Sequence, residues 1–105
     1  MMIKEIKQEE FKEAIAEGFV LLDVYGPHCG PCRMLDKTLH ILEREYPDMT
    51  ILKLDSSLNE QFCEENHIVG VPTLFFFFNG ELKERLTGAL SEDELMEIAG
   101  PYLYA

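Results

Sequence analysis

The sequence predicts an α/β fold in which helices pack on a mixed β-sheet. Short apolar segments typical of strands alternate with longer segments whose apolar residues recur every three or four positions, as on one face of a helix. The dipeptide Asn79-Gly80, between two strand-like segments, predicts a β-hairpin. Strands joined through helices should be parallel and the hairpin should add an antiparallel strand, so the sheet should be mixed.

The first half of the chain should form two strands and two helices. The expected elements are an edge strand over 3–6, a helix over 8–17, a strand over 19–25 and a helix over 34–46 that opens near Cys32. Phe11, Ala14 and Ile15 share one face of the first helix, and Gly18 is its expected C-cap. The apolar strand is interrupted by Asp23, which is costly in a buried position unless it is partnered or protonated. The second helix carries a regular apolar face, formed by Leu35, Leu39, Leu42 and Tyr46, and should end before Pro47.

The second half should add three strands and two helices. A strand is expected over 50–54, and Ser57 and Glu60 resemble a capping box for a short helix with Leu58 and Phe62 inside. The four phenylalanines within 73–78 indicate a strand buried on both sides, paired through the hairpin with 81–87. Ser91 and Glu94 predict the capping box of the last helix, which Gly100-Pro101 should stop or kink.

A pair of cysteines lies where the first buried strand meets the second helix. In Cys29-Gly30-Pro31-Cys32 the cysteines are three residues apart, so on a helix their sulfurs are close enough to form a disulfide. The first helical turn has unpaired N–H groups and the positive end of the helix dipole, which stabilise a thiolate. The accessible Cys29 should therefore be the nucleophile, and the shielded Cys32 should resolve the mixed disulfide. Gly30 lets a substrate backbone approach, and Pro31 fixes φ where no N–H is needed.

Several separated motifs, in order and at matching spacing, resemble the thioredoxin family over almost the whole chain. The motifs are Cys29-Gly30-Pro31-Cys32, Asp23 six residues before the first cysteine, Lys53, Gly70-Val71-Pro72-Thr73, Asn79-Gly80 and Gly88-Ala89. The resemblance implies a thioredoxin fold, a three-layer α/β/α sandwich. It also implies a five-stranded sheet whose strands, numbered along the chain, lie in the order one, three, two, four, five.

The resemblance also implies roles for two residues beside the cysteines. Asp23 resembles the buried general acid/base of the family, whose pKa desolvation should raise so that it can take the Cys32 proton. Lys53 on the neighbouring strand would adjust the pKa of Asp23. The alternative is that Asp23 forms a buried ion pair with Lys53 and has no catalytic task.

A substrate-docking surface is expected around the disulfide. The resemblance implies a cis peptide bond before Pro72, although only about 5–6% of X–Pro bonds in folded proteins are cis. The Val71 backbone would then pair with an extended substrate segment. The residues expected to border this surface are Tyr25, His28, Gly30, Pro31, Val71, Pro72 and Gly88.

The chain departs from the family pattern at several positions. It contains no tryptophan, and His28 and Tyr25 stand where thioredoxins usually carry two. A protonated His28 beside Cys29 would stabilise the thiolate, so we expect a more oxidising couple than in a typical thioredoxin; the alternative is an exposed, neutral histidine with little effect. Lys37 replaces a helix-kinking proline of the family. Cys63 is expected to be a buried core residue; the alternatives are a regulatory thiol or a metal site with Cys29, Cys32 and His28 or His67.

The bulk properties narrow the range of functions. A chain of 105 residues is expected to be one domain, 1–105, without a bound cofactor or metal. A net charge of −11 makes binding to nucleic acids or anionic membranes improbable. The first five residues lack the cationic flank and apolar core of a signal peptide, so we expect a cytoplasmic protein whose thiols are kept reduced.

The sequence therefore predicts a protein-disulfide reductase that works as a monomer and is recharged by a separate thioredoxin reductase, either flavin- or ferredoxin-linked. The alternative function is a non-enzymatic binding module or subunit with the same fold and incidental cysteines.

Overall fold

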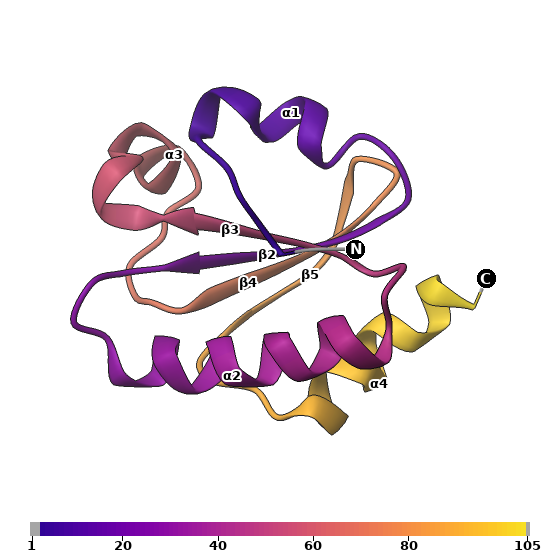
Figure 1. Cartoon of the computed structure of the whole chain (residues 1–105). Coiled ribbons are helices and arrows are strands. Elements are labelled where there is room, and N and C mark those ends of the chain that lie inside the picture. Colours follow the sequence, from indigo (N-terminus) through magenta and orange to yellow (C-terminus); the bar gives the residue numbers. More distant parts are fainter. Residues whose placement is uncertain (1–2, 105) are drawn as a thin grey trace.

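The computed structural model describes residues 3–104 and contains a five-stranded sheet between two layers of helix (Figure 1). The strands are β1 (Lys4–Glu5), β2 (Phe19–Tyr25), β3 (Thr50–Asp55), β4 (Thr73–Phe78) and β5 (Glu81–Thr87). Their order, β1-β3-β2-β4-β5, confirms the order implied by the family resemblance. The pairs β1·β3 and β3·β2 are parallel, and β2·β4 and β4·β5 are antiparallel, which confirms a mixed sheet. Met1 and Met2, where no signal peptide was predicted, lie outside the described residues.

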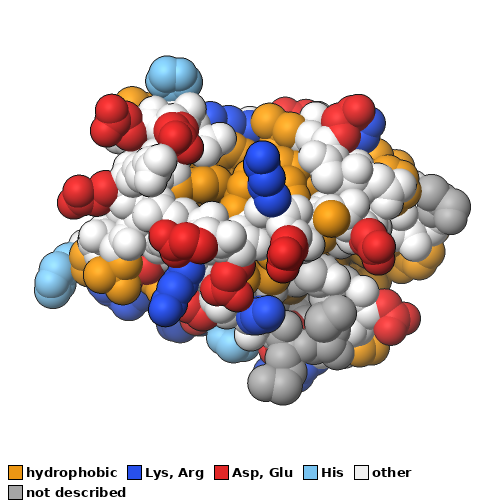
Figure 2. All heavy atoms as spheres, turned by 90° about the horizontal axis from the view of Figure 1, so that it is seen from above, with side chains coloured by type: hydrophobic (Ala, Val, Ile, Leu, Met, Phe, Trp, Pro, Cys, Tyr) orange, Lys and Arg blue, Asp and Glu red, His pale blue; other side chains and the backbone are white. Residues whose placement is uncertain are grey.

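The helices divide between the two faces of the sheet. They are the 3₁₀ helices η1 (Gln8–Glu10) and η2 (Ser56–Leu58), and the α-helices α1 (Phe11–Ala14), α2 (Gly30–Glu45), α3 (Glu60–Glu65) and α4 (Glu92–Leu103). Helices α2 and α4 cover one face, and α1 and α3 cover the other (Figure 1). Figure 2 looks onto the α1/α3 side, where charged side chains of both signs are interspersed and apolar side chains show between them. Within residues 3–104, no helix has the length and apolar character needed to cross a bilayer.

The two faces of β2 belong to two separate apolar cores. Phe19 and Leu21 join the core under α2 and α4, whereas Val20, Leu22 and Val24 join the core under α1 and α3. This alternation follows from the two-residue period of a strand. Asp23 therefore lies on the α2 side, in line with Leu21. The predicted apolar face of α2 is confirmed, since Leu35, Leu39 and Leu42 are all fully buried.

The first helical segment is shorter than the prediction of 8–17. A 3₁₀ turn and a single α-helical turn end at the C-cap Ile15, so Gly18 is not the cap. Gly18 has a φ of +67° and its N–H donates to Asn79 Oδ1 at 2.8 Å, while Asn79 N–H donates to the Gly18 carbonyl at 3.0 Å. Gly18 thus turns the chain toward the β4–β5 hairpin and is hydrogen-bonded to it. The edge strand is also shorter than predicted, covering 4–5 instead of 3–6.

The predicted capping box at Ser57 and Glu60 is wrong. Asp55 caps the preceding 3₁₀ helix instead, accepting from the Ser57 N–H at 2.9 Å and from the Ser57 hydroxyl at 2.7 Å. The Ser57 side chain is thus unavailable to cap α3, whose N-cap is Asn59. This turn leaves Leu58 77% exposed rather than inside, whereas Phe62 is buried as predicted.

The C-terminal part confirms two predictions and corrects one. Asn79 and Gly80 have φ values of +50° and +82°, as a hairpin turn requires. The Ser91–Glu94 capping box is present in full. Of the stop or kink predicted at Gly100-Pro101, the stop is wrong, since α4 continues through Pro101 to Leu103. Tyr102 lies 5.9 Å from Phe19 and 5.4 Å from Phe78, centroid to centroid, and this packing holds the final turn in place.

Candidate active site

The two cysteines form a disulfide at the start of α2. Their Cα atoms are 5.2 Å apart. Cys29 is the N-cap residue of the helix, and its sulfur accepts the N–H of Cys32 at 3.1 Å. This N–H group and the helix dipole stabilise negative charge on the same sulfur when the disulfide is reduced. Cys29 is half-buried and Cys32 is only 5% exposed, so the outer cysteine is the one that another molecule can reach.

The loop before β4 lies against the outer cysteine. The Val71-Pro72 peptide is cis, as the family resemblance implied, and the Val71 carbonyl oxygen is 3.8 Å from the Cys29 sulfur. The N–H of Gly88 donates to the Pro72 carbonyl at 2.9 Å, so the loop after β5 supports this segment. Gly88 has a φ of +101°, which strongly favours glycine. The structure thus brings Cys29, Val71, Pro72 and Gly88 together.

Of the other predicted border residues, three lie at the start of α2, whereas the Tyr25 side chain contacts Glu5 of β1 and Lys53 of β3. His28 and Pro31 are exposed, Gly30 is half-buried, and His28 adopts a left-handed φ of +54°. Tyr25, at the end of β2, donates its hydroxyl to Glu5 Oε1 at 2.9 Å. Burial and this hydrogen bond raise the pKa of Tyr25, so its hydroxyl stays protonated.

Asp23 carries a fully buried carboxyl group on the central strand β2. Its exposed fraction is 0%, and neither carboxyl oxygen has a hydrogen-bond partner among residues 3–104. Burial raises the pKa of Asp23 from its ordinary value of 3.8 to about 7; Lys53 opposes this shift, while Asp36 and Glu5 add to it. Asp23 can therefore gain or lose a proton near neutral pH, which is what a general acid/base requires.

Lys53 lies beside Asp23 in the sheet but binds a different carboxylate. The two residues are direct Cα partners across β2 and β3. The Lys53 ammonium, however, donates to Asp36 Oδ1 at 2.6 Å and lies 4.4 Å from the centre of the Tyr25 ring. The alternative of a buried Asp23–Lys53 ion pair is therefore wrong. The reason is that α2 crosses this part of the sheet and supplies a second acid.

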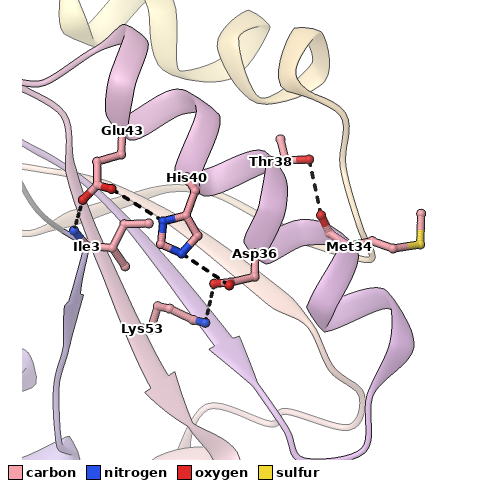
Figure 3. A network of polar contacts seen from close by, with 7 residues as sticks. All are labelled: Ile3, Met34, Asp36, Thr38, His40, Glu43 and Lys53. Atoms are coloured by element: carbon pink, nitrogen blue, oxygen red, sulfur yellow. Dashed lines mark hydrogen bonds and ion pairs between the residues drawn. The ribbon is translucent and has the colours of Figure 1, made fainter.

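Asp36 was not among the predicted site residues. Its Oδ2 lies 3.4 Å from His40 Nε2, and His40 Nδ1 lies 3.6 Å from Glu43, which also accepts the Ile3 N–H (Figure 3). A signal was available in the sequence, because Asp36 follows Cys32 by four residues and so lies on the same face of the helix.

Gly26 was also missed. It is buried between β2 and the cysteines, and a Cβ at this position would lie 3.1 Å from Val71 Cγ2 and 3.3 Å from Ser56 Oγ. A side chain here would push against the loop that contacts Cys29. Its place directly after the strand and before Pro27 was the only sequence signal, and it does not distinguish a close contact from an ordinary turn.

Cys63 lies apart from the disulfide. It is half-buried against the core under α1 and α3, rather than fully buried as expected, and its thiol lies 3.8 Å from the Ser56 carbonyl oxygen. Burial raises the pKa of the Cys63 thiol, so its reactive thiolate form is disfavoured at neutral pH. The alternative of a metal site with the cysteines and His28 or His67 is wrong for the part of the chain that the structure covers, where no three metal-ligating side chains converge.

Comparisons with known proteins agree with this geometry. The sequence model of a family described as Thioredoxin matches residues 2–100. A thioredoxin of Chlamydia trachomatis serovar D is 37% identical over 97 residues, covering 92% of this chain and 95% of that protein. A thioredoxin of Listeria monocytogenes serovar 1/2a is 32% identical, covering 97% of this chain and 100% of that protein. A thioredoxin of Bacillus subtilis strain 168 is 31% identical, covering 98% and 100%.

Proposed function

The chain belongs to the thioredoxin family, and from this premise we propose how its own residues carry out the family's reaction. It is a thiol–disulfide oxidoreductase that reduces protein disulfides through Cys29 and Cys32 and is recharged by a reductase. A binding module with incidental cysteines is not favoured, because the cysteine pair, the helix start and the cis-proline loop are all present.

In the proposed reaction, Cys29 begins the exchange. Its thiolate attacks one sulfur of a substrate disulfide, forms a mixed disulfide and releases the other substrate sulfur as a thiolate, which takes up a proton. The Val71 backbone, 3.8 Å from Cys29, holds the substrate segment during this step. Tyr25, His28, Gly30, Pro31, Pro72 and Gly88 border the docked segment.

Cys32 completes the exchange. It loses its proton, attacks the Cys29 sulfur and releases the second substrate sulfur as a thiolate, which is then protonated. Two electrons have passed to the substrate, and the protein is left with the Cys29–Cys32 disulfide. Asp23 accepts the Cys32 proton, and Lys53 sets how strongly Asp23 holds it. Support comes from the burial of Asp23 on the α2 side of the sheet and from its pKa of about 7.

The observation that carries this proposal is the Cys29 sulfur at the N-terminus of α2, in contact with the cis-proline loop. The test is reduction of insulin driven by dithiothreitol. Wild-type protein should accelerate insulin precipitation, and Cys29→Ser should be no faster than dithiothreitol alone. Cys32→Ser should instead accumulate a mixed disulfide with insulin. An active Cys29→Ser variant would contradict the assignment of the nucleophile.

The setting of the reaction is also a proposal. Residues 1–105 form one thioredoxin domain that acts as a monomer in the cytoplasm, without bound cofactor. A flavin- or ferredoxin-linked reductase restores the dithiol by supplying two electrons and two protons. Sedimentation of the reduced protein tests the monomer. Recharging of the oxidised protein by each purified reductase class, followed as new free thiols, distinguishes the two donors.

A further inference from the structure

The side chains near Asp23 present an imbalance of charge. Asp23, Lys53 and Asp36 come from β2, β3 and α2, and Glu5 comes from β1. Asp23 and Lys53 extend from neighbouring strands on the α2 side of the sheet, since Leu21 and Ile51, two residues before each, both lie in the core under α2. The only cation among these four groups is thus adjacent to Asp23 and yet bound to Asp36.

We propose that Asp36 is a positioning residue for disulfide exchange: it holds the Lys53 ammonium away from Asp23, so that the buried carboxylate is a strong enough base to accept the Cys32 proton. This inference rests on the proposed role of Asp23 as the proton acceptor for Cys32. The same face of α2 then carries both the resolving Cys32 and Asp36, which determines the proton affinity of Asp23.

The geometry of Lys53 carries the argument. Its ammonium donates to Asp36 Oδ1 (Figure 3) at 2.6 Å. It also lies 4.4 Å from the centre of the Tyr25 ring, and the Lys53 side chain is only 18% exposed. Neighbouring strands are about 4.8 Å apart, so a lysine directly beside Asp23 can reach it if released. The Asp23 carboxyl group has no hydrogen-bond partner among residues 3–104, so it would accept the ammonium.

The other charged groups around this site do not offer Lys53 an equally free carboxylate. Glu5 is the Cα partner of Lys53 on β1, but its Oε1 accepts the Tyr25 hydroxyl. Glu43 faces His40 and the Ile3 N–H. His40 contacts the second oxygen of Asp36, which leaves Oδ1 directed at Lys53 (Figure 3). Asp36 is therefore the one carboxylate among these groups that binds Lys53 directly.

The position of Lys53 determines how strongly Asp23 binds the proton that it takes from Cys32. An opposite charge within about 4–6 Å of a carboxylate strengthens its ionised form by tenfold or more. With Lys53 released, Asp23 would ionise at lower pH and become a weaker base toward Cys32. With Lys53 held, the carboxylate binds a proton strongly enough to take it from Cys32, and Lys53 still moderates the effect of burial.

The test is to titrate Asp23 directly in the oxidised protein, where neither active-site cysteine titrates. The carboxyl carbon of Asp23 is followed by ¹³C NMR in wild type, in Asp36→Asn and in Glu45→Gln. The last is the matched control, because it removes one exposed negative charge from the far end of the same helix. Asp36→Asn should weaken proton binding by Asp23 about tenfold or more, while Glu45→Gln should leave it unchanged.

A second pair of variants separates positioning from simple charge. In a Lys53→Met background, Asp36→Asn should change the Asp23 titration much less than in the wild-type background. An equal effect in both backgrounds would overturn the proposal, since Asp36 would then act only through its own charge. An unchanged Asp23 titration in Asp36→Asn would overturn it as well. Circular dichroism of each variant verifies that it is folded.

The pH profile of insulin reduction distinguishes this proposal from the proposed function. Asp36→Asn should shift the acidic limb of the profile toward lower pH by the same amount as the Asp23 titration. If the titration moves and the pH profile does not, the acid/base role of Asp23 fails, and Asp36 has no part in the reaction.

Discussion

Replacing Asp23 with asparagine tests the central physical feature of the site, the buried carboxyl group. In the folded protein its pKa is about 7, compared with an ordinary value of 3.8. The folded state therefore binds this proton more tightly than the unfolded state. Protonated Asp23 therefore stabilises the folded state relative to ionised Asp23. This stabilisation is fully present below pH 3.8 and is lost as the pH rises through 7, because the charged form is the one that burial disfavours.

The change in the free energy of unfolding follows from the difference between the pKa of Asp23 in the folded protein and its ordinary pKa. A difference of about three pH units corresponds to roughly 4 kcal/mol in the free energy of unfolding, as an order of magnitude. Roughly 2–3 kcal/mol of this should be lost between pH 5 and pH 8. Asparagine is close in size and cannot ionise, so the Asp23→Asn variant should lack this loss and be the more stable protein at pH 8.

The assay is urea unfolding of the oxidised proteins at several pH values. The chain has no tryptophan, so far-ultraviolet circular dichroism is the suitable probe. Contributions from other titrating groups cancel in the difference between variant and wild type at each pH. Asp48→Asn, at an exposed aspartate after α2, serves as a control. Its free energy of unfolding should change with pH in the same way as that of wild type. If the free energy of unfolding of Asp23→Asn also changes with pH as that of wild type does, the Asp23 carboxyl group does not titrate between pH 5 and pH 8. That result would refute the assignment of a raised pKa to Asp23.

Three further predictions concern other parts of the molecule. Gly26→Ala should lower the free energy of unfolding by roughly 1–3 kcal/mol, measured by urea unfolding, because its Cβ would crowd Val71; an unchanged value would mean that the loop yields freely. His28→Trp should have a lower reduction potential than wild type in equilibrium with glutathione, since an indole, unlike an imidazole, cannot bind a proton and place a positive charge beside the Cys29 thiolate; equal potentials would eliminate a role for His28. Ser91→Ala should cost about 1 kcal/mol of stability through loss of the α4 cap, whereas a neutral result would argue that solvent replaces the Ser91–Glu94 bonds.

Local signals in the sequence were sufficient for most of the fold. The alternation of strands and helices, the Asn79-Gly80 turn and the Ser91–Glu94 cap depend on residues close together in the chain, and all appear in the structure. Two predictions, at Gly18 and at Gly100-Pro101, failed where a distant partner competed with a local one. Gly18 is hydrogen-bonded to Asn79 instead of capping the first helix, and the packing of Tyr102 on Phe19 stabilises the helical turn that contains Pro101.

For the site, the sequence by itself determined which atoms react. A cysteine at the N-cap of a helix and a second cysteine three residues later need only local backbone geometry to become a redox pair. Tertiary structure decided which acid binds Lys53, because that choice depends on where α2 crosses the sheet and which carboxylate it brings within 2.6 Å of the ammonium. It also decided that Asp23 has no hydrogen-bond partner among the described residues 3–104, since burial and the position of bonding neighbours are properties of the assembled layers and not of any segment.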